Sequence, residues 1–208
     1  MYTHQNNYTA AGTPAAQAKA ALVMLHGRGG SAADIIRLAN VFNLKDTAIY
    51  APEATNNSWY PYSFMAPEQQ NQPALDSALE QIGALVEKIE QEGIASEHIY
   101  FAGFSQGACL TLEYVARNAK RYGGAIAYTG GLIGERLVTD RYKGDFSGTP
   151  ILITTGDHDA HVPLKRVEES VEVLEGLGAN VTLKVYPDKP HSIWQEEIEL
   201  AGSVVFNA

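Results

Sequence analysis

Cysteine is nearly absent from the chain: Cys109 is the only one in 208 residues. One thiol cannot close an internal disulfide, which fits a reducing compartment, and we expect a cytoplasmic protein. Residues 1–13 have neither a basic start nor an apolar run, so they do not predict a secretory signal. No stretch approaches the ~20 apolar residues of a membrane-spanning helix, so stable membrane insertion is not expected.

Basic residues are also few: 15 lysines and arginines stand against 24 aspartates and glutamates, for a net charge of −9. The basic residues are scattered along the chain and form no cluster. A field of this sign repels a phosphate backbone, so we expect no nucleic-acid partner. The acidic balance is otherwise typical of a soluble surface.

The remaining composition is that of a globular protein, with 45% hydrophobic and 19% charged residues. We find no internal repeat and no low-complexity tract. The length fits one domain over residues 1–208.

Strand-like and helix-like segments alternate along the chain. Six buried strands are predicted, at 21–25, 47–51, 99–102, 125–128, 151–155 and 181–186. Helices are predicted at 31–41 with Ser31 as N-cap, at 73–92, at 106–118, from Pro163 to Gly178, and after a capping box of Ser192 and Gln195. This alternation predicts a mostly parallel sheet covered by helices on both faces, with ligands bound beyond the carboxyl ends of the strands. Two long irregular stretches remain, at 53–72 and 129–149.

The segment Gly103-Phe104-Ser105-Gln106-Gly107 matches G-x-S-x-G between a predicted strand and a predicted helix. A chain that turns at once from strand to helix has no room for side chains on the flanks of the central residue, and glycine provides that room. The motif also arises by chance as an ordinary glycine-flanked turn. Its context favours Ser105 as a nucleophile, with the amide of Gln106 beside the reacting oxygen.

A serine nucleophile needs a histidine base oriented by a carboxylate, in the chain order Ser, Asp or Glu, His on such a sheet. Asp157 and Asp159 follow one predicted strand, and His191 follows the next. Either aspartate could serve at this point. A metal site built from these aspartates with His158 and His161 is the weaker reading, and we expect no metal. The other histidines precede Ser105 and are poor candidates for its base: His4, His26 and His98.

The loop His26-Gly27-Arg28-Gly29-Gly30 follows the first predicted core strand, where a second oxyanion donor is expected. We expect this donor to be the backbone amide of Arg28. A phosphate-binding loop is the rival, but neither Walker nor G-x-G-x-x-G spacing is present.

The irregular stretch 53–72 is rich in aromatic residues. We expect Trp59, Tyr60 and Met65 to contact substrate, although a loop that merely covers the core fits the pattern equally well. Cys109, on the helix after Ser105, is expected to be a packed thiol rather than a reactive one.

Taken together, these motifs resemble the phospholipase/carboxylesterase family of α/β-hydrolases, which includes the acyl-protein thioesterases. The resemblance spans Leu22 to about Val205 and rests on four segments: Leu25 to Gly30, Gly103 to Ala108, Gly156 to Pro163, and His191. It implies an α/β-hydrolase fold with a minimal cap or none, a triad of Ser105, Asp159 and His191, and an oxyanion hole of the Arg28 and Gln106 amides. It favours Asp159 over Asp157 because Asp159 stands three residues before Val162.

What the resemblance implies is a serine esterase that acts on small carboxylic esters without a cofactor. Arg28 stands where the acyl-protein thioesterases have an apolar residue, and no lipid channel is evident, which argues for short acyl chains. Ser105 replaces the cysteine of dienelactone hydrolases, which argues against that activity. A thioesterase, a lysophospholipase and a non-catalytic ligand-binding homologue remain as alternatives, and a homodimer is an open expectation.

Overall fold

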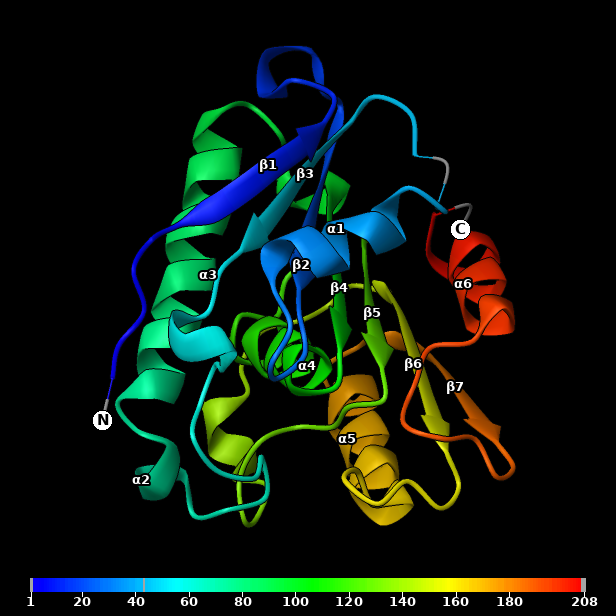
Figure 1. The fold of residues 1–208 in the computed structure, drawn as a ribbon. Coiled ribbons are helices and arrows are strands. Elements are labelled where there is room, and N and C mark those ends of the chain that lie inside the picture. Colours follow the sequence, from blue (N-terminus) through cyan, green and yellow to red (C-terminus); the bar gives the residue numbers. More distant parts are fainter. Residues whose placement is uncertain (1, 43, 207–208) are drawn as a thin grey trace.

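The computed structural model describes residues 2–42 and 44–206, which build one seven-stranded sheet in the order β1-β3-β2-β4-β5-β6-β7 (Figure 1). The strands are β1 (Tyr8–Gly12), β2 (Ala20–Leu25), β3 (Thr47–Pro52), β4 (Ile99–Phe104), β5 (Gly124–Tyr128), β6 (Pro150–Gly156) and β7 (Asn180–Tyr186). All neighbouring strands run parallel except β1, which is antiparallel to β3 at one edge. The carboxyl ends of β2 and of β4 to β7 therefore meet at one side of the molecule.

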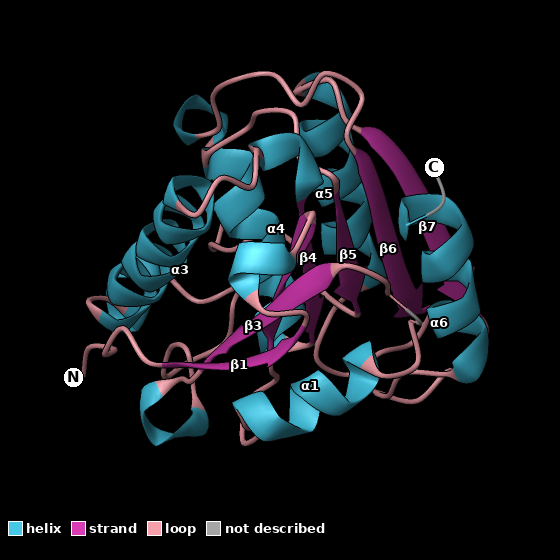
Figure 2. Cartoon of the chain, turned by 90° about the horizontal axis from the view of Figure 1, so that it is seen from above, coloured by secondary structure: helices cyan, strands magenta, loops and turns pink. Residues whose placement is uncertain are grey.

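Helices cover both faces of this sheet. They are α1 (Ala32–Ala39), α2 (Glu68–Asn71), α3 (Ala74–Gln91), α4 (Gln106–Arg117), α5 (Leu164–Gly176) and α6 (Gln195–Ala201), which continues into a π-helical turn, η5 (Gly202–Phe206). The 3₁₀ turns are η1 (Ala15–Gln17), η2 (Thr55–Asn57), η3 (Ser96–His98) and η4 (Thr139–Arg141). Seen from above, α3, α4 and α5 lie on one face, and α1 and α6 lie on the other (Figure 2). None of the described helices is both long and apolar enough to span a membrane.

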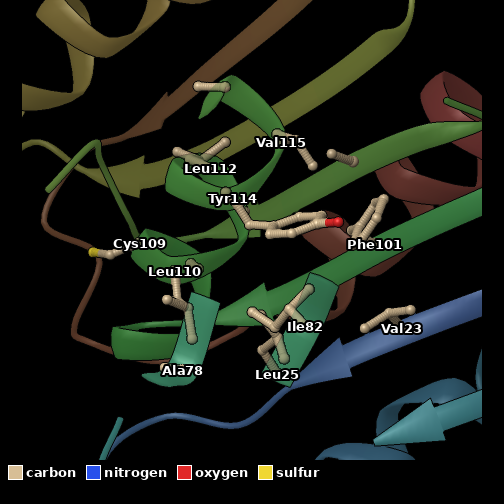
Figure 3. Close-up of a cluster of buried hydrophobic side chains, with 14 of the residues drawn as sticks. Val23, Leu25, Ala78, Ile82, Phe101, Cys109, Leu110, Leu112, Tyr114 and Val115 are labelled. Carbon is tan, nitrogen blue, oxygen red and sulfur yellow. The ribbon is translucent and has the colours of Figure 1, made fainter. Parts of the chain in front are cut away.

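The core consists of two hydrophobic clusters, one on each face of the sheet. Alternate residues of β2 enter opposite clusters: Val23 and Leu25 pack toward α3 and α4, whereas Leu22 and Met24 pack toward α1. Figure 3 shows Val23 and Leu25 beside Ile82 of α3. Because both faces of the strand are buried, β2 is a continuous apolar run rather than an alternating pattern.

The predicted strands and helices are present, with bounds that differ by a few residues. Ser31 caps α1, as its Oγ accepts a hydrogen bond from the amide of Asp34 at 3.2 Å. The capping box predicted at Ser192 and Gln195 is wrong. Helix α6 begins at Gln195, and the carboxylate of Glu197 instead accepts from the amide of Trp194 at 2.6 Å.

The edge strand β1 was not predicted. Its side chains are mostly exposed and its sequence is Tyr-Thr-Ala-Ala-Gly, so no apolar alternation marks it. It is held by antiparallel pairing to β3, with Tyr8 opposite Pro52 and Gly12 opposite Ala48. Such backbone pairing leaves little trace in the sequence of an edge strand.

Candidate active site

Ser105 occupies the turn between β4 and α4, with φ at 54° and ψ at −117°. This backbone conformation is strained for a residue with a side chain. It persists only where the surrounding structure enforces it. A Cβ atom on Gly103 would lie 2.3 Å from the carbonyl oxygen of Gly107, and one on Gly107 would lie 2.1 Å from that of Leu25. Glycine is therefore required at both flanks, for the steric reason expected from the motif.

The structure brings Ser105, His191 and Asp159 together from the ends of three strands. The Oγ of Ser105 lies 2.7 Å from Nε2 of His191, and Nδ1 of His191 lies 2.7 Å from Oδ2 of Asp159. With Asp159 ionised, Nδ1–H donates to the carboxylate, which leaves Nε2 as the acceptor for the serine O–H. The three side chains thus form one continuous chain of hydrogen bonds.

Asp159 is held as a carboxylate. Burial opposes its ionisation, but hydrogen bonds from His191 and from the amides of His161 and Val162 outweigh burial, so its pKa lies below the ordinary value. The two amides lie 2.8 and 2.9 Å from Oδ1. These amides belong to residues two and three positions after Asp159, so the turn before α5 itself fixes the carboxylate toward His191.

Asp157, the alternative acid, lies apart from this chain. Its Oδ1 accepts from the amide of Asp188 at 2.9 Å and lies 2.9 Å from Nδ1 of His158. Asp157, His158 and Asp188 are close enough to share a metal ion, and within the ranges 2–42 and 44–206 no other group of this kind is found. His158 and Asp188 are exposed, and the set differs from the combination of Asp157, Asp159, His158 and His161 considered from the sequence.

Arg28 and Gln106, whose backbone amides are the expected oxyanion donors, both line the cleft that contains Ser105 and His191. Neither amide donates a hydrogen bond to another described residue. The turn that carries Arg28 is fixed by its neighbours: the amide of Gly29 donates to Asn57 at 2.7 Å, and that of Gly30 donates to Gly27 at 3.1 Å. Backbone amides without an acceptor, on two residues that line the same cleft as Ser105, can donate to a negatively charged oxygen there.

The cleft has a volume of about 610 Å³. It is lined by Arg28, Tyr60, Pro61, Tyr62, Ser63, Phe64, Ser105, Gln106, Cys109, His161, Val162 and His191. Tyr62 and Phe64 belong to the aromatic residues that make stretch 53–72 a candidate pocket wall, whereas nothing in the sequence marks Pro61 and Ser63 as cleft residues.

Of the three expected substrate contacts, only Tyr60 lines the cleft. Trp59 is fully buried, and its indole N–H donates to the carbonyl of His26 at 2.8 Å. Met65 is half-buried and packs against the core. Stretch 53–72 thus both covers the core and forms the cleft wall.

Cys109 is buried at the cleft wall, and burial raises the pKa of its thiol to about 12, so it is a packed thiol as expected.

The side chain of Gln106 fixes that wall. Its Oε1 accepts from the amide of Trp59 at 2.9 Å, and its Nε2 donates to the carbonyl of Tyr60 at 2.8 Å. The residue next to Ser105 therefore lines the cleft and holds the segment at Trp59 and Tyr60 with its side chain.

The ring of His26 connects the turn at Gly27 to the start of stretch 53–72. Its Nδ1 lies 2.8 Å from the carbonyl of Gly27, and its Nε2 accepts from the amide of Ala54 at 3.2 Å. A carbonyl only accepts and an amide only donates, so the ring is neutral with its proton on Nδ1. Burial lowers the pKa of His26, in agreement with this neutral form. Both ring nitrogens of His26 are therefore engaged by backbone groups, and neither contacts Ser105.

A parallel sheet with a serine at the β4–α4 turn, an acid after β6 and a histidine after β7 defines the α/β-hydrolase fold. A model of the phospholipase/carboxylesterase family matches residues 6–205. The chain therefore belongs to the phospholipase/carboxylesterase family and is a hydrolase, as the resemblance predicted.

Relatives of known name agree with this assignment. A probable carboxylesterase of Oryza sativa subsp. japonica is 30% identical, over 93% of this chain and 79% of its own. The crystal structure of a phospholipase/carboxylesterase from Dyadobacter fermentans is 61% identical with a TM-score of 0.98, over 99% of both chains. The structure of SOBER1 from Arabidopsis thaliana, 22% identical with a TM-score of 0.77 over 91% of this chain and 99% of its own, shares the fold.

Proposed function

We propose that the protein is a carboxylesterase that hydrolyses small carboxylic esters through an acyl-enzyme on Ser105. The observation that carries the proposal is the unbroken hydrogen-bond chain from Ser105 through His191 to Asp159, with both contacts at 2.7 Å. A serine hydroxyl becomes a strong nucleophile only beside such an oriented base.

In the proposed reaction, Nε2 of His191 takes the hydroxyl proton as Oγ of Ser105 attacks the ester carbonyl. Asp159 holds the ring and stabilises its positive charge. The amides of Arg28 and Gln106 bind the tetrahedral oxyanion, and one such donor is worth about 10²–10³ in rate. His191 then protonates the leaving alcohol, and a water molecule activated by His191 hydrolyses the acyl-enzyme. Every proton transfer is assigned to His191, and no step requires a cofactor.

The cleft wall supports short acyl groups. Tyr60 and Phe64 line the cleft although only 1% and 6% exposed, so bulky aromatic residues packed into the core form part of its wall. A thioesterase or a lysophospholipase would use the same triad, so acyl length separates these candidates. Rates for p-nitrophenyl esters and acyl thioesters from acetyl to palmitoyl are expected to be highest at the short ester end. A maximum at palmitoyl, or a preference for thioesters, would favour the alternatives.

The proposed nucleophile is tested by Ser105→Ala, which should remove nearly all turnover of p-nitrophenyl acetate. Ser192→Ala is the matched control, since Ser192 neighbours His191 but bonds only the carbonyl of Pro190, at 3.4 Å. That control should retain turnover. Equal rates for Ser105→Ala and the wild type would overturn the proposal.

A further inference from the structure

Arg28 gives the cleft its charge. Of the residues that line the cleft, it is the only lysine, arginine, aspartate or glutamate among those the structure describes. The side chain of Arg28 is exposed, and its guanidinium carbon lies 6.0 Å from the centre of the Tyr60 ring. A cleft in a chain of net charge −9 is therefore lined by a single formal charge, which is positive.

The guanidinium of Arg28 is held in a fixed position. Nη1 donates to Oγ of Ser58 at 2.9 Å and to the carbonyl of Pro61 at 3.0 Å, and Nη2 donates to the carbonyl of Tyr62 at 2.7 Å. All three acceptors are neutral, so they orient the group without compensating its charge. These bonds use three of the five N–H groups of an arginine, which leaves two for a further acceptor.

No carboxylate within the described ranges lies within 4.0 Å of the Arg28 nitrogens. Three other arginines are paired with glutamates: Arg117, Arg141 and Arg166. Asp34 borders a neighbouring hollow with Arg28, but its carboxylate accepts from Ser31 and lies 3.7 Å from Arg37. A preoriented, uncompensated arginine that lines the same cleft as Ser105 is suited to a carboxylate, which accepts two parallel N–H bonds.

We propose that the natural substrate is an ester that carries a carboxylate a few bonds from the scissile carbonyl, and that the Arg28 guanidinium binds this carboxylate. The inference rests on the proposed esterase function and names its substrate class. Arg28 thereby serves twice: its amide faces the oxyanion, and its side chain positions the charged end of the substrate. Ser105 displaces the alcohol from the acyl–oxygen bond and water then hydrolyses the acyl-enzyme, so a half-ester of a dicarboxylic acid yields the diacid and an alcohol.

The test compares monoethyl glutarate with ethyl pentanoate, two ethyl esters of equal acyl length that differ in the terminal carboxylate. Hydrolysis is followed by proton release. The wild type is expected to favour monoethyl glutarate in kcat/KM by about tenfold, the scale of one charge-assisted interaction. The preference should shrink as salt rises from about 0.05 to about 0.5 M, since Arg28 is exposed.

Arg28→Met keeps the backbone amide and removes the charge, so the preference should fall to about one. Arg28→Lys keeps the positive charge but loses the planar group that donates two parallel N–H bonds, so it should retain part of the preference. Arg121→Met is the matched control: Arg121 is an exposed arginine outside the cleft that donates to the carbonyl of Ser147, and its loss should leave the preference unchanged.

Equal kcat/KM for the two esters in the wild type, or a preference that survives in Arg28→Met, would overturn the inference while leaving the esterase intact. Failure of both esters together with no labelling by a fluorophosphonate would instead contradict the proposed function. Protection of the enzyme by glutarate against fluorophosphonate labelling is a second test, which does not depend on turnover. Free glutarate should slow fluorophosphonate labelling of the wild type and not of Arg28→Met, and equal labelling rates would count against the carboxylate site.

Discussion

The ammonium group of Lys189 lies 3.0 Å from the carboxylate of Glu197, and neither side chain is exposed to solvent. Lys189 also donates to the hydroxyl of Thr129 at 3.1 Å, and Glu197 accepts from the hydroxyl of Thr154. The pair thus ties the loop after β7 to the ends of β5 and β6. Since Lys189 stands two residues before His191, this buried ion pair fixes the segment that presents the base to Ser105.

Removal of one partner of this pair should be strongly destabilising. Lys189→Met leaves the Glu197 carboxylate buried and uncompensated, and we expect a loss of about 3–5 kcal/mol in the free energy of unfolding, measured with urea. The double variant Lys189→Met with Glu197→Gln removes both charges and should recover part of that loss. Additive losses in the double variant would show that the two groups do not interact.

The two candidate acids should respond differently to loss of charge. Asp159→Asn removes the negative charge and, because two amides hold Oδ1, turns an NH2 donor toward Nδ1 of His191 in place of the accepting oxygen, so kcat should fall by about 10⁴, as for other triads. Asp157→Asn is the matched control, because Asp157 contacts His158 and Asp188 instead. The measurement is kcat for a short p-nitrophenyl ester. A large loss in Asp157→Asn and a small one in Asp159→Asn would reverse the assignment.

Glycine at the turn around Ser105 is required by contact with backbone. Gly107→Ala places a Cβ 2.1 Å from the carbonyl oxygen of Leu25 and should cost on the order of 3 kcal/mol or more in stability. Gly83→Ala is the control within α3, where the added Cβ meets only Tyr114 at 3.9 Å. It should stabilise by roughly 0.5–1 kcal/mol, since alanine favours the helix. Equal thermal midpoints for the two variants would contradict the steric account.

Acid should destabilise the protein partly through His26. Burial lowers its pKa in the folded state, whereas the unfolded chain binds the proton near the ordinary value of ~6.5. The unfolded state therefore holds more protons below that pH, and stability falls as the pH decreases toward the folded pKa, by up to about 1.4 kcal/mol per pH unit. His4, whose pKa burial also lowers, adds to the effect.

The check is the urea free energy of unfolding between about pH 8 and pH 5. His26→Gln should flatten this dependence, whereas the control His98→Gln, at an exposed side chain, should keep the wild-type slope. An unchanged slope in His26→Gln would mean that this ring does not link folding to protons.

Local signals predicted much of this fold. The apolar runs at 21–25 and 151–155 are strands because both faces of a parallel sheet are buried, and G-x-S-x-G located the turn at Ser105 because its glycines meet backbone. The expected bounds of α3 and α5 were close because prolines open both helices and glycine follows each end. By contrast, β1 is not predicted from the sequence because its mostly exposed side chains show no apolar alternation.

The parts of the site that could not be predicted depend on contacts between distant segments. The sequence predicts that Trp59 contacts substrate. In the structure its indole N–H instead donates in the core to the carbonyl of His26, a residue 33 positions earlier in the sequence. The segment that brings Pro61 and Ser63 to the cleft is held by hydrogen bonds from the side chains of Arg28 and Gln106, 33 and more residues away in sequence. Nothing in the sequence marks Lys189 and Glu197 as a pair, since it is the fold that buries them against each other.

The most direct test of the account is the site at which a fluorophosphonate reacts. The hydrogen bond from Ser105 to His191 should make this hydroxyl the one reactive serine, so the intact mass should rise by a single adduct. Peptide mapping by mass spectrometry should place that adduct on Ser105, and His191→Ala should abolish it. An adduct on another serine, or labelling that persists in Ser105→Ala, would contradict the central claim.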